Sequence, residues 1–73
     1  MDKGSIANGN GGFSPREAEI MALIERGLSD KQIALHLGIS YRTIRTHLER
    51  LFRDHGLHNR ASALARWLRE GAP

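Results

Sequence analysis

Apolar residues recur every three or four positions in four segments of this chain, and polar residues fill the positions between them. This spacing follows the period of a helix rather than the alternation of a strand. We therefore expect four helices, over about 15–26, 30–37, 41–55 and 60–70. Because no segment has the alternating pattern of a half-buried strand, the predicted fold class is all-α.

Residues suited to helix capping precede each of these segments. Ser14 is followed three residues later by Glu17, which is the pattern of a capping box, and the same spacing recurs after Ser29. Ser40 and Asn59 precede the third and fourth segments, and a glycine directly follows every segment. Each predicted helix therefore has both a start signal and a stop signal.

The first residues of the chain differ from the rest. Residues 1–12 are mainly glycine, asparagine and serine, so we expect a flexible N-terminal arm or linker there. We expect one small domain over 13–71. The chain has no cysteine, and it shows neither a membrane-spanning apolar run nor a signal-peptide core. These features predict a cytoplasmic protein without disulfides.

The segment 41–55 has two unlike sides. A turn of about three residues that begins with Gly38 precedes it, and such short turns set two helices at a large angle, as in a helix-turn-helix. Ile44, Leu48 and Leu51 fall on one side of the predicted helix. The opposite side carries Arg42, Arg45, Thr46, Glu49 and Arg53. A recognition helix for the major groove needs this division, although an ordinary surface helix with i,i+4 ion pairs shows it too.

Positive charge is concentrated in the C-terminal half of the chain. Residues 40–73 hold seven arginines against three acidic residues, whereas residues 1–39 hold four basic residues against five acidic ones. Arginine binds phosphate and guanine edges in a forked geometry that lysine cannot offer. The charge therefore indicates a nucleic-acid partner, while charge alone also fits a solvated surface.

Five short motifs follow one another along residues 13–70: "SPRE", "GLSDKQIA", "LGIS", "TIRTH" and "NRASA". In this order and spacing they resemble the LuxR-type (GerE-like) helix-turn-helix DNA-binding domain. The resemblance implies a sequence-specific transcriptional regulator, or the output domain of one, that binds double-stranded DNA. The recognition helix would be the segment at about 41–55, lying in the major groove.

The resemblance also implies eight DNA-binding residues. Arg45, Thr46 and Glu49 would contact base edges, for which guanine, a thymine methyl and a cytosine amine are suitable partners. The family usually has lysine at the position of Arg45. Arginine keeps the charge and can also donate two parallel hydrogen bonds to one base. The phosphate backbone would be held, together with amides at helix starts, by Lys31, Ser40, Arg42, Thr43 and Arg60.

Members of the family commonly dimerise through the fourth helix, which implies a homodimer on two half-sites. The candidate residues are Leu64, Trp67 and Leu68, which share the inward side of the predicted helix with Ala63. For Trp67, packing in the core of one chain is an equal alternative, because tryptophan is favoured in both settings. RNA polymerase is a further candidate partner.

Two positions depart from the family pattern in ways that concern packing. Leu35 stands where a charged residue is usual, so we expect an exposed apolar side chain. His55 replaces a core leucine, and we expect it to loosen the contact with the fourth helix.

Other functional classes fit the sequence less well. The four histidines lack the spacing of a metal site, and no nucleophile with a neighbouring base stands out, so we predict no enzyme, metal or cofactor. Two alternatives remain for the binding function. One is a sigma-factor fourth-region domain, although "TIRTH" followed by "NRASA" favours the LuxR type. The other is a protein-interaction module of the same fold, which the arginines on the third helix disfavour.

Overall fold

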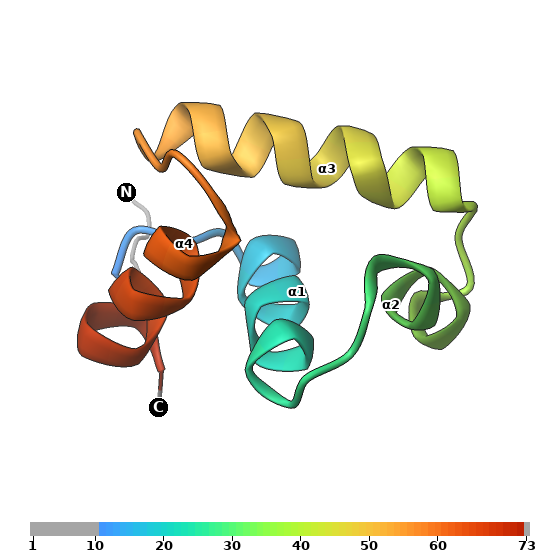
Figure 1. Cartoon of the computed structure of the whole chain (residues 1–73), viewed down its shortest axis with the longest axis horizontal. Helices are drawn as coiled ribbons and strands as arrows, with labels where there is room; N and C mark the ends of the chain where they lie inside the picture. Colours follow the sequence, from blue (N-terminus) through green and yellow to red (C-terminus); the bar gives the residue numbers. More distant parts are fainter. Residues whose placement is uncertain (1–10, 73) are drawn as a thin grey trace.

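The computed structural model describes residues 11–72, and they form helices joined by short turns, with no strand among them (Figure 1). The elements are α1 (Pro15–Glu25), α2 (Asp30–Leu37), α3 (Tyr41–Asp54), α4 (Arg60–Arg66) and a closing π-helical turn η1 (Trp67–Gly71). The predicted all-α class and the four helices are confirmed. The arm expected over 1–12 lies outside the described residues, except for a turn at Gly11 and Gly12.

Each helix begins at the predicted cap. The Ser14 hydroxyl accepts a hydrogen bond from the Glu17 N–H at 3.1 Å, and the Glu17 carboxylate accepts one from the Ser14 N–H at 2.9 Å. The same reciprocal pair forms between Ser29 and Gln32. These bonds satisfy backbone N–H groups that have no partner within the helix, so the starts of α1 and α2 are fixed locally.

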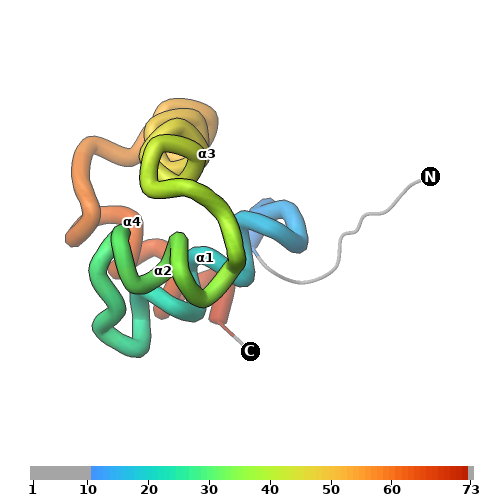
Figure 2. The backbone as a smooth tube through the Cα atoms, turned by 90° about the vertical axis from the view of Figure 1, so that its right-hand side faces the viewer, coloured from blue at the N-terminus to red at the C-terminus, as the bar shows by residue number. Residues whose placement is uncertain are grey.

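The turn between α2 and α3 is set by Gly38. Its φ of +70° is a left-handed conformation that side chains disfavour. The following Ile39 N–H donates to the Ala34 carbonyl oxygen at 3.0 Å, which closes the end of α2. Ser40 then caps α3, so the chain changes direction within a few residues (Figure 2).

The helix α3 lies across the layer formed by α1, α2 and α4 (Figures 1 and 2). Its inner side places Ile44, Leu48 and Leu51 in the core, as the periodicity predicts. The buried side chains come from all four helices, from η1 and from Phe13: Phe13, Ile20, Met21, Leu23, Ile24, Ile33, Ala34, Ile44, Leu48, Leu51, Ala63 and Trp67. Because its back is buried, the front of α3 is held in a fixed orientation.

The C-terminal end packs differently from the expectation. Trp67 is 2% exposed, lies edge-on to Phe13 at 5.6 Å between ring centroids, and donates from Nε1 to the Glu25 carboxylate at 2.7 Å. The expected inward position of Leu68 is wrong, because this side chain is 54% exposed. Only one stripe of a helix can face the core, and Leu68 lies roughly 100° further round the axis than Trp67.

His55 contacts two side chains at the edge of the core. Its Nε2 lies 3.0 Å from the Glu17 carboxylate, and its ring lies 4.5 Å from that of Phe13. Burial alone would raise the pKa of Glu17, but hydrogen bonds from the Ser14 N–H and from His55 outweigh burial and hold this pKa below its ordinary value. The histidine thus makes polar and aromatic contacts where a leucine would make apolar ones.

Candidate nucleic-acid interface

The outer side of α3 is open to solvent. Arg42, Arg45, Thr46, Glu49 and Arg53 are all exposed, whereas the apolar side chains of Ile44, Leu48 and Leu51 are buried. No acidic residue stands in the first turn of α3, so the positive end of the helix dipole is not neutralised there. We call the exposed residues of this side and of the adjoining start of α2 the reading face: Lys31, Tyr41, Arg42, Arg45, Thr46 and Glu49.

Tyr41 connects two cations on the reading face. Its hydroxyl accepts a hydrogen bond from Arg45 Nη1 at 3.1 Å. The Arg45 guanidinium and the Lys31 ammonium lie 5.9 Å and 5.8 Å from the centre of the tyrosine ring. The hydrogen bond that Arg45 donates to Tyr41 is the main cause that raises the pKa of Arg45 above its ordinary value. Lys31 of α2 and Arg45 of α3 therefore border one patch.

Sequence reasoning missed Tyr41. The available signal was its spacing, because an aromatic residue four positions before an arginine on a helix lies beside that arginine. With 44% of its surface exposed, Tyr41 belongs to the same solvent-facing region as the predicted DNA-binding residues.

Three hydroxyl groups at the start of α3 have partners within the helix. Ser40 accepts from the Thr43 N–H at 3.0 Å, and the two hydroxyl oxygens lie 2.9 Å apart. Thr46 donates its hydroxyl hydrogen to the Arg42 carbonyl oxygen at 3.2 Å. The Thr46 methyl group is then the part suited to contact a thymine methyl, whereas Ser40 acts first as the helix cap.

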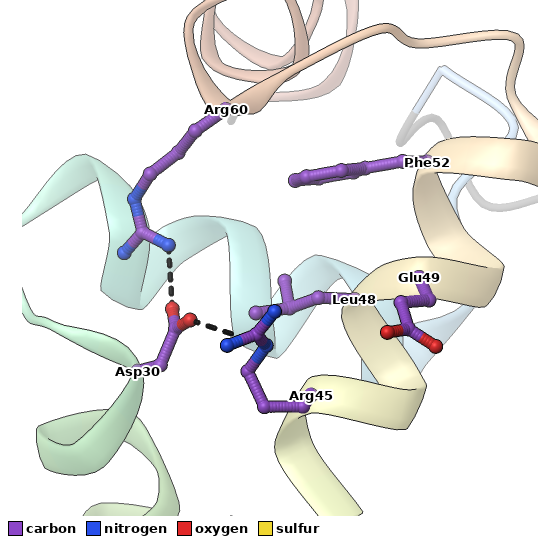
Figure 3. A pocket seen from close by; sticks show the side chains of 6 residues that line it. All are labelled: Asp30, Arg45, Leu48, Glu49, Phe52 and Arg60. Atoms are coloured by element: carbon purple, nitrogen blue, oxygen red, sulfur yellow. Dashed lines mark hydrogen bonds and ion pairs between the residues drawn. The ribbon is translucent and has the colours of Figure 1, made fainter.

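A crevice of about 310 Å³ opens beside the reading face (Figure 3). It is lined by Asp30, Arg45, Leu48, Glu49, Phe52 and Arg60. Asp30 points between the two arginines. One carboxylate oxygen lies 2.6 Å from Arg60 Nη1 and the other lies 4.0 Å from Arg45 Nε. Arg60 also donates from Nη2 to the Leu28 carbonyl oxygen at 2.7 Å.

The predicted DNA-binding residues therefore fall into two groups. Seven of them are exposed and border α3 or the start of α2: Lys31, Ser40, Arg42, Thr43, Arg45, Thr46 and Glu49. Arg60 differs, because it is half-buried and its guanidinium is already bonded to Asp30 and Leu28. Sequence reasoning missed Asp30, which as an acid in a first turn reads as an ordinary partner of the helix dipole.

The candidate dimerisation residues are also separated by the fold. Leu68 is exposed and Leu64 is partly buried, whereas Trp67 lies in the core. The packing alternative for Trp67 thus describes its position in the single chain. Leu35, as expected, is highly exposed at 82%.

Among residues 11–72, no group of three or more histidine and acidic side chains has the arrangement of a metal site. Within the same residues, no helix combines the length and the apolar character needed to cross a membrane.

The chain is similar to several curated transcription regulators. It is 37% identical over 67 residues to an HTH-type transcriptional regulator of Mycobacterium bovis, covering 92% of this chain and 8% of that protein. It is 38% identical over 56 residues to the HTH-type transcriptional regulator GfsR of Streptomyces halstedii, covering 77% of this chain and 23% of that one. With the C4-dicarboxylate transport transcriptional regulatory protein DctR of Rhodobacter capsulatus it shares 49% identity over 43 residues, or 59% of this chain and 22% of the relative.

These matches cover a small part of each relative, so the chain spans at most about a quarter of their length. No solved structure matches the chain significantly. Residues 12–67 match the family of bacterial regulatory proteins, luxR family, which is more than half of the chain. The chain therefore belongs to the luxR family of bacterial regulatory proteins and carries the DNA-binding helix-turn-helix domain of these transcription regulators.

Proposed function

We propose that this domain reads a specific sequence of double-stranded DNA by inserting the front of α3 into the major groove. One observation carries the proposal: α3 buries Ile44, Leu48 and Leu51 on one side and exposes three arginines on the other side. A helix of this kind fits the width of the major groove and can bring its side chains to base edges.

The reading face suggests how contacts are divided. We assign Arg45, Thr46 and Glu49 to base edges, because they lie on the exposed middle of α3. Lys31, Arg42 and Thr43 lie nearer the helix starts and are suited to phosphates, as is the cap residue Ser40. Arg60 would reach a phosphate only with the N–H groups that Asp30 and Leu28 leave free.

The test begins with selection of bound sequences from a random pool of duplexes, followed by affinity measurements on the selected site. Arg45→Ala is expected to lose preference at one base pair, by about 1–3 kcal/mol. Arg16→Ala is the matched control, since it removes the same charge from an exposed residue on α1, away from the reading face and from η1. If the Arg45→Ala variant lost affinity equally for all duplex sequences, this result would contradict a base-reading role.

The affinity of the wild-type domain should also fall steeply with salt, because binding to phosphates releases counterions. A Lys31→Ala variant should weaken binding to all duplexes alike and reduce the steepness of this dependence. Affinity that is independent of salt would contradict phosphate binding.

We further propose that two copies associate through α4 and η1 on a site with two half-sites. The exposed Leu68 and the partly buried Leu64 are the side chains available for this contact. Sedimentation of the domain with the selected duplex should give two copies per duplex, and Leu68→Ser should reduce this to one. A single copy on a symmetric site with wild-type protein would contradict the proposal.

The proposed role is binding without catalysis, in the compartment that holds the DNA, with RNA polymerase as a further partner in transcription. Membership of the luxR family supports this role over that of a sigma-factor domain or a module that binds only proteins.

A further inference from the structure

Asp30 faces two arginines that come from different helices. Its carboxylate lies 2.6 Å from Arg60 Nη1, at the start of α4, and 4.0 Å from Arg45 Nε, in the middle of α3 (Figure 3). Asp30 itself is the first residue of α2. A single side chain therefore links three helices at the edge of the reading face.

The carboxylate is held in place by its own surroundings. The N-terminus of a helix favours a negative charge, and Asp30 stands in the first turn of α2 beside the Ser29 cap. Only 23% of its side chain is exposed. Arg60 fixes it further, because the guanidinium bonds both Asp30 and the Leu28 carbonyl that precedes α2. The position of Asp30 is thus set before any ligand arrives.

The Arg45 guanidinium has a polar partner on each of two sides. Its Nη1 donates to the Tyr41 hydroxyl at 3.1 Å, while its Nε faces Asp30 at ion-pair distance. Arginine has five N–H donors, so these contacts leave hydrogens at the end of the guanidinium for a base. A side chain already held in one region loses less conformational freedom on binding than a free one.

We propose that Asp30 is a positioning residue for DNA reading, which holds Arg45 toward its base through the ion pair and anchors Arg60 between α2 and α4. This inference rests on the proposed function. On this proposal, an acidic residue favours the recognition of DNA, although DNA is itself negatively charged.

The proposal predicts two opposite effects of removing the charge. An Asp30→Asn variant keeps the size of the side chain and an oxygen that can accept from Arg60. Loss of one negative charge near the phosphates should raise affinity for random duplexes by about twofold to fivefold at low salt. Loss of the hold on Arg45 should lower discrimination at the base that Arg45 reads by about threefold to tenfold. A merely destabilising change would lower both quantities.

Asp54→Asn is the matched control. Asp54 is also an acid beside an arginine, with 3.7 Å between its Oδ1 and Arg53 Nε, but it lies at the far end of α3. This variant should raise affinity for random duplexes and leave discrimination at the Arg45 base unchanged. If Asp30→Asn discriminates as well as Asp54→Asn does, the positioning role is overturned.

The outcome for the wild-type domain separates the two proposals. If it selects no duplex sequence, both the proposed function and the positioning role fail. If it selects a site and the two variants behave alike, only the positioning role fails.

A second measurement covers the case in which Asp30→Asn does not fold. In the ¹⁵N-labelled wild-type domain, the Nε–Hε bond of Arg45 should move less on the nanosecond timescale than that of Arg42. Arg42 makes no side-chain ion pair with the other described residues, so it serves as the internal reference. Equal motion of the two bonds would overturn the claim that Arg45 is held in place.

Discussion

The reading face and the C-terminal corner of the domain are held together by different kinds of contact. The corner, which we define as Phe13, His55, Trp67 and Gly71, has its two largest aromatic side chains almost wholly buried. The reading face is exposed, and its side chains are held by single hydrogen bonds and ion pairs. Loss of a corner residue should therefore lower the free energy of unfolding, whereas loss of a reading-face residue should leave the fold intact and change which DNA is bound.

The largest expected effect is that of Trp67→Ala. Its ring packs against Phe13 and bonds to Glu25, so its removal should lower the free energy of unfolding by about 3–5 kcal/mol. Chemical unfolding followed by circular dichroism measures this change. Leu68→Ala, at the exposed neighbouring position, should cost far less, and equal losses in the two variants would contradict the core role of Trp67.

A smaller loss of stability is expected from Gly71→Ala. A Cβ at this position would lie 2.5 Å from Trp67 Cε3 and 3.1 Å from Phe13 Cδ2, so the aromatic rings must shift. Overpacking of this kind costs about 1–3 kcal/mol. The unfolding midpoint should fall in Gly71→Ala and stay near the wild-type value in Arg69→Ala. An unchanged midpoint in the glycine variant would show that the corner tolerates added volume.

The Tyr41→Phe variant tests the reading face. It removes the hydroxyl that accepts from Arg45 Nη1 and keeps the ring beside Lys31. Discrimination at the Arg45 base should weaken by about 0.5–1 kcal/mol, because one exposed hydrogen bond is lost. The unfolding midpoint should not move. A fall in stability without a change in DNA preference would place Tyr41 with the structural residues.

The smallest expected effect is the part of the pH dependence of stability that comes from Glu17. Because the folded state lowers the pKa of this carboxyl, the unfolded chain binds its proton more readily than the folded chain as pH falls. The contribution of Glu17 to stability is therefore present above its ordinary pKa and is lost as pH falls through the lowered value. We expect less than about 1 kcal/mol, since the side chain is partly exposed.

Glu17→Gln should flatten this part of the stability curve between pH 6 and pH 3, while glutamine still completes the capping box with Ser14. Glu19→Gln, an exposed residue of the same helix, is the control. If both variants follow the wild-type pH dependence, the contact with His55 contributes nothing measurable.

The sequence predicts this fold well because most of its signals are local. Ser14 and Glu17 lie one helical turn apart, and Gly38 fixes its turn through its own backbone, so both can be recognised from short patterns. The buried side of α3 follows from the spacing of Ile44, Leu48 and Leu51.

The contacts that tie the site together are not local. Asp30 meets Arg60 thirty positions along the chain, and Trp67 meets Glu25 across forty-two. Helical spacing places Leu64, Trp67 and Leu68 near one side of the predicted fourth helix, whereas in the fold it is Trp67 that packs against Phe13, bonds to Glu25 and is buried. Spacing along one helix therefore could not assign their roles.

The most direct test is to titrate the ¹⁵N-labelled domain with the selected duplex and follow every amide and arginine Nε signal. We predict that the largest shifts occur at Lys31, Arg42, Arg45 and Thr46, and that the signals of Ile20 and Met21, which are buried in α1, change little. Large shifts confined to the C-terminal corner, with the front of α3 unaffected, would contradict the claim that this helix reads DNA.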